Sequence, residues 1–392
     1  METKVVTAHG TGDAAQATEQ VIATIRASCS TSGPTLILLF ASTQQSLGEV
    51  ATKTQQAFPS ATVLGASTAG EFTEKGDAKG SLAAVAIEGD FKVAAGIAEG
   101  LRANAESAVV RALADIPSEM PGYPYRTALL LVDPLAGNGE EATLIAAAIL
   151  GEGVKLAGGA AGDDLKMERT EISLGATVHS DAFALAVLFT QSPLGIGVCH
   201  GHKPLSGPLR ITRAAGAVVH EIDGRPAWDV WREQTSEHAT SHGFAELDAD
   251  REGAYFLTYE AALTTGDELK IRAPLSRDAQ GAISFACGIP EGAVIRITES
   301  TSKRQVESAR EAARRASAQL GGQPVAGAIV FDCICRNLIL GEDFGAAVRA
   351  MSAELGGAPL AGFETYGEIA LDVGDMSGFH NTTSVVLAFP RC

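Results

Sequence analysis

A strand–helix–strand pattern occurs three times along the chain, and this recurrence limits the fold more than any other feature. Each copy starts with an apolar run of strand length, continues with a helical segment and ends in a second apolar strand. The first strands are expected at 35–41, 127–133 and 327–332. The lengths are typical of right-handed βαβ crossovers, so each copy should contain a pair of parallel strands.

The three copies also end alike. Each second strand is followed by a glycine, a loop of small residues and an acidic residue, in the sequences VLGASTAGE, KLAGGAAGDD and PLAGFETYGE. A further strand-like run follows each loop, at 81–89, 182–189 and 382–389. We expect these runs to lie antiparallel beside the parallel pairs. The predicted fold class is therefore α/β with α+β character, built as layered mixed sheets with repeated β-α-β units.

The length of the chain indicates two modules. Its 392 residues are too many for one ordinary core, and 46% of them are hydrophobic, which excludes intrinsic disorder. A Gly/Pro-rich stretch at 194–213 precedes the expected boundary, which divides the chain into an N-terminal module at 1–220 and a C-terminal module at 221–392. In the second module we expect strands at 254–259, 269–273, 281–287 and 293–298 and a helix at 300–320.

Charge and cysteine content indicate the environment of the protein. A net charge of −17 disfavours nucleic acid as a partner, because an acidic chain repels phosphate. The apolar runs are shorter than the roughly 20 residues of a membrane helix, and the N-terminus has no secretory signal pattern. Six cysteines are too few for a disulfide scaffold. We therefore expect a cytoplasmic protein with reduced thiols and no membrane contact.

Two enzyme-like motifs are incomplete. Residues 10–15 match G-x-G-x-x-A, but the next strand ends at 40–42 without the carboxylate that a dinucleotide site needs. Residues 65–70 approach a nucleophile elbow, with the second glycine displaced by one position. We therefore expect no catalysis by either motif.

The small-residue loops are candidate ligand sites, because ligands commonly bind at strand ends of α/β units. Their backbone N–H groups and polar side chains would contact a small polar ligand. The candidates are Ser67, Thr68, Gly70 and Glu71 in the N-terminal loop and Glu364, Thr365, Tyr366 and Glu368 in the C-terminal loop. The alternative is that these loops are tight turns that only connect elements.

Cys333, Cys335 and Arg336 form a second candidate group. In an extended strand the two thiols would face the same side and serve as a redox pair or part of a soft metal site. Arg336 would favour a thiolate or pair with an anionic group. The alternative is that the cysteines are small buried hydrophobic residues.

Six segments resemble the FIST sensory proteins, which pair an N-terminal FIST module with a C-terminal one. They are VLGASTAGEF (63–72), LAGGAAGDD (156–164), IDGRPAWDVW (222–231), FDCICR (331–336), PLAGFETYGEIA (359–370) and FHNTTSVVLAF (379–389). The resemblance covers about residues 20–389 and implies an intracellular ligand sensor in signal transduction. Small amino-acid-like ligands are suggested for the family. Its stand-alone bacterial members include haem proteins that sense nitric oxide and act on a separate histidine kinase.

Three histidines are candidate axial ligands if haem is bound. His200 and His202 would place both rings on one face of an extended segment. His380 lies beside Asn381, a further candidate ligand-binding residue, and would face the site with Glu364 and Glu368. Imidazole is the usual protein ligand of haem iron. No C-x-x-C-H motif is present, so the group would be non-covalent haem b. Solvated or structural histidines, the latter bonded to loop carbonyls, are the alternative.

We therefore predict a ligand sensor without catalysis of its own, most concretely a haem-based nitric oxide sensor that regulates a histidine kinase or another signalling protein. Nitric oxide would weaken or displace an axial ligand and change the surface that the kinase contacts. The alternatives are a sensor without haem whose amino-acid-like ligand is held by the Gly-rich loops and Arg336, a thiol enzyme using Cys333 and Cys335, and an interaction scaffold. The output is expected on another protein, and a homodimer stays open.

Overall fold

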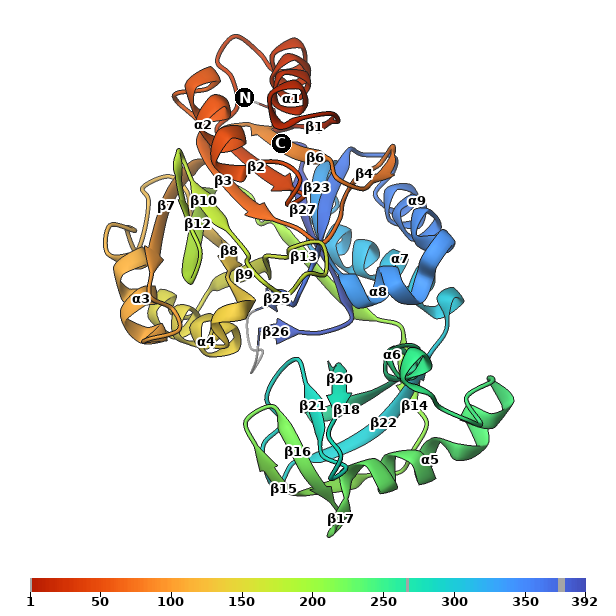
Figure 1. Cartoon of the computed structure of the whole chain (residues 1–392). Helices are drawn as coiled ribbons and strands as arrows, with labels where there is room; N and C mark the ends of the chain where they lie inside the picture. Colours follow the sequence, from red (N-terminus) through yellow and green to blue (C-terminus); the bar gives the residue numbers. More distant parts are fainter. Residues whose placement is uncertain (1, 266–267, 373–377) are drawn as a thin grey trace.

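The computed structural model describes residues 2–265, 268–372 and 378–392 (Figure 1). Its helices pack on mixed sheets that contain both parallel and antiparallel strand pairs. The predicted α/β class with layered mixed sheets is confirmed.

The first unit shows how the repeated pattern folds. Its strand β2 is parallel to β3 and antiparallel to β6. β2 is buried along its whole length, because one face meets the central core and the other meets the helices. In chain order the elements are β1 (Lys4–Gly10), α1 (Ala14–Ser28), β2 (Leu36–Ala41), α2 (Leu47–Ala57), β3 (Thr62–Ser67), β4 (Glu71–Thr73), β5 (Gly76–Ala78) and β6 (Leu82–Glu88).

The second unit repeats this order. Its parallel pair is β8 with β9, and β12 lies antiparallel to β8. The elements are β7 (Lys92–Glu99), α3 (Ala105–Leu113), β8 (Tyr125–Val132), α4 (Gly139–Leu150), β9 (Val154–Ala160), β10 (Ile172–Leu174), β11 (Thr177–His179) and β12 (Ala182–Thr190).

The third unit has the same order but is interrupted after its first strand. Its parallel pair is β23 with β24, and β27 lies antiparallel to β23, so all three predicted crossovers are confirmed. The elements are β13 (Gly195–His200), α7 (Ser302–Ala318), β23 (Val325–Cys333), α8 (Ile334–Leu340), α9 (Phe344–Glu354), β24 (Leu360–Thr365), β25 (Glu368–Leu371), β26 (Phe379–His380) and β27 (Thr383–Pro390).

The three units exchange hairpins in a closed ring. The β4–β5 hairpin of the first unit pairs with β24 of the third, and the β25–β26 hairpin of the third pairs with β9 of the second. The β10–β11 hairpin of the second unit pairs in turn with β3 of the first. Each of the six-stranded sheets formed by the described residues therefore contains two strands from another unit.

The inner faces of these three sheets meet in one hydrophobic core. The core combines side chains from all three units, and the ring of Phe363 lies 4.9 Å from that of Phe40 and 5.7 Å from that of Phe331. The helices cover the outer faces of the sheets (Figure 1). We call this three-sheet arrangement the core body.

An inserted module separates β13 from α7. Its described residues form a nine-stranded sheet with two helices, and it lies below the core body in Figure 1. The predicted boundary between residues 220 and 221 falls within β16 of this sheet. The elements of the inserted module are β14 (His202–Pro204), β15 (Leu209–Ala215), β16 (Val218–Ile222), β17 (Arg225–Pro226), α5 (Ala227–Ser241), α6 (Ala249–Thr258), β18 (Tyr259–Thr265), β19 (Glu268–Arg272), β20 (Pro274–Arg277), β21 (Ile283–Phe285) and β22 (Val294–Ser300).

The strand predicted at 254–259 is wrong, because α6 extends to Thr258. Asp248 caps this helix by accepting a hydrogen bond from the backbone N–H of Arg251 at 3.0 Å. The rings of Tyr255 and Phe256 pack at 5.7 and 5.8 Å from Trp228 of α5. Packing against a neighbouring helix therefore outweighs the strand propensity of the aromatic run.

The glycines that close two of the parallel pairs generate a stability prediction. A Cβ on Gly362 would lie 2.0 Å from the carbonyl oxygen of Val330, and one on Gly158 would lie 2.0 Å from that of Leu130. Since a backbone carbonyl cannot move aside cheaply, Gly362→Ala should lower the free energy of unfolding by about 2 kcal/mol or more. Urea denaturation measures this change.

Gly253→Ala is the matched control, because Gly253 lies in α6 with no atom within 4 Å of its added Cβ. This change should raise stability by up to about 1 kcal/mol through helix propensity. Equal effects of the two substitutions would contradict the steric argument.

Candidate functional site

The main candidate site is a cavity of about 710 Å³ where the inserted module meets the core body. This volume is within the range of small-molecule sites, which is roughly 300–1,000 Å³. Its walls come from β13, α7 and the β25–β26 region of the core body and from β19 of the inserted module. The polar side chains that line it are those of Cys199, His200, Arg314, Arg315, Gln319, Asp372, His380 and Thr383.

His380 provides an imidazole held in one orientation. Its Nε2 lies 3.1 Å from the carbonyl oxygen of Ala370, so we assign the ring hydrogen to Nε2 as the donor. This tautomer leaves Nδ1 as a lone-pair acceptor. Burial lowers the pKa of His380 to about 3, assisted by the nearby cations Lys270 and Arg272. The ring is therefore neutral at physiological pH, as a metal-ligating imidazole must be.

His200 also lines the cavity, but both of its ring nitrogens are engaged. Nε2 lies 3.1 Å from the carbonyl oxygen of Leu269 in β19, and Nδ1 accepts from the backbone N–H of His202 at 3.3 Å. Burial lowers the pKa of His200 to about 4. His200 therefore forms a bond between the two walls of the cavity.

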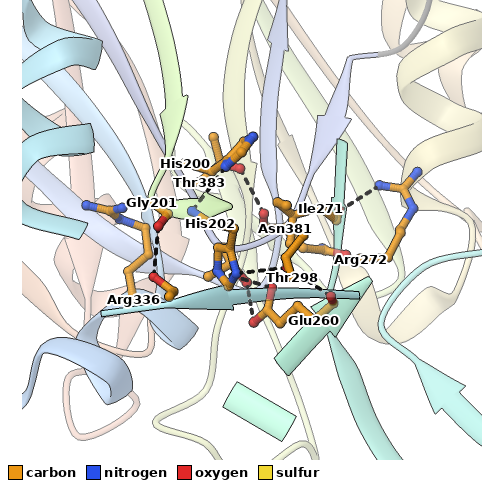
Figure 2. Close-up of polar contacts among 12 residues, drawn as sticks. His200, Gly201, His202, Glu260, Ile271, Arg272, Thr298, Arg336, Asn381 and Thr383 are labelled. Carbon is orange, nitrogen blue, oxygen red and sulfur yellow. Dashed lines mark hydrogen bonds and ion pairs between the residues drawn. The ribbon is translucent and has the colours of Figure 1, made fainter. Parts of the chain in front are cut away.

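His202 lies behind the cavity rather than in its wall. Its side chain is fully buried between Thr298 of β22 and Glu260 of β18 (Figure 2). Burial lowers the pKa of His202 well below its usual value. The structure thus brings two of the three candidate histidines to one cavity and places the third in the interior.

Charged side chains lie around the remaining wall. Arg314 and Arg315 of α7 both pair with Glu311, at 2.6 and 2.9 Å. Arg315 also donates to the carbonyl oxygen of Val198 at 2.8 Å. Asp372 provides a negative charge, and its Oδ1 lies 3.4 Å from Nζ of Lys155. The cavity therefore offers guanidinium groups and a carboxylate along with neutral imidazoles.

The small-residue loops lie elsewhere, at the junction of the three exchanged hairpins. The backbone N–H of Ala69 donates to the carbonyl oxygen of Glu364 at 3.1 Å, and the N–H of Glu364 donates back to that of Gly70 at 2.7 Å. A Cβ on Gly70 would lie 2.6 Å from the Glu364 carboxylate. Glycine at position 70 therefore permits close approach of the two loops.

The other candidates in these loops also contact protein groups. The Ser67 hydroxyl accepts from the N–H of Glu171 at 2.8 Å, and the Tyr366 hydroxyl donates to Asp163 at 2.6 Å. Glu368 accepts from the Thr365 hydroxyl at 2.5 Å. Thr68 is fully buried, and its hydroxyl has no partner among the described residues. The bonds of Ser67 and Tyr366 therefore join different units, whereas the bond between Thr365 and Glu368 lies within the third unit.

Buried carboxyl groups concentrate at this junction. Burial raises the pKa of Glu71 to about 9, with further increases from the nearby Asp164 and Glu364. Burial and the charge of Asp332 raise the pKa of Glu364 to about 8. Burial also raises the pKa of Glu368 well above its usual value. The junction therefore favours protonated carboxyl groups.

The expected geometry of Cys333 and Cys335 is wrong, because the strand ends between them. Cys333 is the last residue of β23, and Cys335 lies in the first turn of α8, so strand alternation does not apply. Burial raises the pKa of the Cys333 thiol well above its usual value. A protonated buried thiol is a poor nucleophile, so the geometry does not favour a thiol enzyme.

Arg336 and Asn381 are both buried near this strand end. The Arg336 guanidinium donates to Asp332 at 2.5 Å and to the Ser308 hydroxyl at 2.8 Å, and it also contacts Gln305 of α7. These bonds occupy the guanidinium within the protein. Asn381 donates to the carbonyl oxygen of His380 at 3.0 Å, which places it directly behind the cavity wall.

Sequence reasoning missed most of the cavity wall. The arginines of α7 carry the pattern of a solvated helix face, and Leu269 and Ile271 read only as part of a strand. No local signal identifies them, because their proximity depends on where the inserted module rests.

The fold and the cavity together define a two-part α/β protein with a cavity of small-molecule size between its parts. The model of the FIST N domain matches residues 35–225, and that of the FIST C domain matches residues 227–371. The chain therefore belongs to the FIST family. FIST domains are sensor domains of signal transduction that bind small ligands.

One curated relative is an uncharacterised protein of Methanocaldococcus jannaschii. It is 24% identical to this chain over 162 residues, which cover 40% of this chain and 31% of the relative. The match thus spans about a third of the relative's length. Among the described residues, no helix is long and apolar enough to cross a membrane.

The buried carboxyl junction predicts a pH dependence of stability. The pKa of Glu71 is about 9 in the folded protein against an ordinary value of 4.5. The stabilisation by its protonated form is complete below pH 4.5 and is lost as the pH rises through 9. Glu71→Gln should therefore reduce the loss of unfolding free energy between pH 5 and pH 9 by about 1–3 kcal/mol.

Urea denaturation across this pH range measures the effect, with Glu237→Gln on the exposed surface of α5 as the control. The control should keep the wild-type pH profile. A profile of Glu71→Gln identical to that of the wild type would contradict the assignment.

Proposed function

We propose that this chain senses a small ligand in the cavity between the core body and the inserted module, and that the ligand site holds non-covalent haem b that responds to nitric oxide. The observation that carries the proposal is the neutral ring of His380 in the cavity wall. Its Nε2 is fixed by the carbonyl of Ala370, which leaves Nδ1 as the lone pair available to a metal. A second nitrogen bonded to a backbone carbonyl is typical of metal-ligating histidines.

The other residues of the cavity fit this group. Arg314 and Arg315 would pair with the two propionate carboxylates. Their present bonds to Glu311 are surface ion pairs, with 57% and 46% of the arginine side chains exposed. Such pairs contribute about 0–1 kcal/mol, so exchanging one carboxylate for another costs little. Bound haem would supply an iron atom that takes nitric oxide.

The signal would leave the cavity through the chain itself. A change at His380 alters the turn between β26 and β27, and a change at His200 alters the bond to Leu269 of the inserted module. A ligand that binds one conformation of the chain more tightly than another shifts the population toward that conformation. We propose that a separate histidine kinase or another signalling protein recognises the shifted surface.

Titration of the purified full-length chain with hemin tests this function. We expect a stoichiometric Soret band that is shifted or weakened in His380→Ala and that responds to nitric oxide after reduction. His179→Ala is the control, because His179 pairs with Glu99 on β7 outside the cavity. Absence of a stoichiometric band would contradict haem binding. A band unchanged in both His380→Ala and His200→Ala would keep haem but show that another residue is the axial ligand.

An amino-acid-like ligand is the second candidate, favoured by opposite charges in the same cavity. Arg315 would bind a carboxylate and Asp372 an ammonium group. This placement differs from the site predicted with Arg336, whose guanidinium is occupied inside the protein.

Thermal-shift titration with single amino acids distinguishes this candidate from haem. A ligand at 100 times its Kd should stabilise the folded chain by about 2.7 kcal/mol. Asp372→Asn should reduce this effect, while Asp278→Asn, directly after β20 and outside the cavity, should not. Equal melting temperatures with every amino acid would eliminate this candidate.

A further inference from the structure

We propose that Thr382, Glu260 and His202 form a coupling latch through which an occupant of the cavity changes how the inserted module is held on the core body. The inference rests on the proposed function in one respect, namely that the cavity binds a ligand. It concerns a step which the cavity alone does not explain, the transfer of the signal between the two parts of the chain.

Thr382 is the strained member of the latch. It is fully buried and has a φ of 51°, a left-handed conformation that is rare for a β-branched residue. Its hydroxyl donates to Oε1 of Glu260 at 2.8 Å. A residue keeps such a backbone conformation only where its surroundings enforce it, so the bond to Glu260 helps to hold the turn in place.

Glu260 is the central member, and its two oxygens face different parts of the protein. Oε1 contacts Thr382 of the core body, and Oε2 lies 3.6 Å from Nε2 of His202 in β14. Both side chains of this second pair are fully buried, and neither Oε2 nor Nε2 has a hydrogen-bond partner among the described residues. Figure 2 shows Glu260, His202 and Thr298 pointing toward one another.

Two unpartnered polar atoms aimed at each other just beyond bonding distance need an explanation, because buried polar groups normally pair. A shift of less than 1 Å would make a hydrogen bond between them. In the proposed latch, Thr382 holds Oε1 in both arrangements, and the arrangements differ in whether Oε2 is hydrogen-bonded to His202. Such a discrete two-state element is what physical coupling between sites requires.

Both ends of the latch reach the cavity. Thr382 follows His380 by two residues, and His202 follows His200 by two residues with a direct bond from its N–H to the His200 ring. His200 of β13 and His380 of β26 both line the cavity. Movement of either histidine therefore shifts one partner of Glu260.

The charged groups around the latch do not hold Glu260 in either arrangement. Glu368 of β25 is the nearby carboxyl that acts on Glu260, and Arg304 and Arg336 act on His202 from α7 and α8. Arg336 is bonded to Asp332, and Arg304 is paired with Glu299. In the proposed latch, the distance between Oε2 of Glu260 and Nε2 of His202 therefore depends on geometry that the cavity controls.

Hydrogen–deuterium exchange of the full-length chain with and without hemin tests the latch. In the wild type, hemin should change the exchange rates of β18 and β22 amides by about threefold or more. In Thr382→Val, which removes the hydroxyl and keeps the side-chain shape, the Soret titration should be retained within threefold while the exchange response is lost. Thr382→Ser, which keeps the hydroxyl, should retain both.

Thr240→Val on the surface of α5 is the matched control and should behave as the wild type in both measurements. An exchange response that persists undiminished in Thr382→Val would overturn the latch. Loss of the Soret band in the wild type would instead contradict haem binding, so the two failures are distinct.

A second arm needs no ligand. A double-mutant cycle of His380→Gln with Glu260→Gln should show a non-additive change of about threefold or more in the exchange rates of β18, because the latch links the two positions. Additive changes would overturn the latch even if the haem assignment fails.

Discussion

The exchange of hairpins among the three units is the constraint on which the rest of the structure depends. No unit completes its own sheet, because each sheet takes two strands from another unit. A single unit would therefore leave a strand edge open and one sheet face uncovered, as in repeat proteins. The closed ring pairs these edges and buries the three inner faces together. It also forces the loops that link strand to hairpin into one crowded junction.

The crowded junction explains why residue types that commonly contact ligands can have a structural role. Gly70 lies against the carboxylate of Glu364, and the backbones of the two loops bond to each other. Gly permits such close approach because it has no Cβ, and glycine is also common where a backbone approaches a ligand. The cavity at the inserted module has a different character, since imidazole rings and guanidinium groups line it. The residue types of the junction therefore do not distinguish a structural role from a ligand site, and only their spatial neighbours do.

The repeated units could be predicted from the sequence because β2, β8 and β23 are continuous apolar runs of strand length, each followed by a helical period. The inserted module was harder, since the aromatic residues of α6 favour a strand until Trp228 supplies a helix packing surface. Two of the candidate haem-ligating histidines, His200 and His380, do line one cavity. Their chemistry is visible in the sequence, but the carbonyls of Leu269 and Ala370 that orient them come from distant segments. No spacing rule connects such segments before the fold is known.

The position of the insertion gives the core body its asymmetry. In the first two units a short connection joins the opening strand to its helix, whereas in the third β13 and α7 are separated by the whole inserted module. The cavity forms at this break. Here β13 lacks the short connection to its helix that β1 and β7 have. A closed ring with a shared core resists movement, because its sheets cannot shift independently. The interface of the inserted module is therefore the part of the described structure that can change at the lowest cost, and the bonds from His200 to Leu269 and from Thr382 to Glu260 cross it. In the proposed mechanism, the core body keeps its fold and the response is confined to this interface.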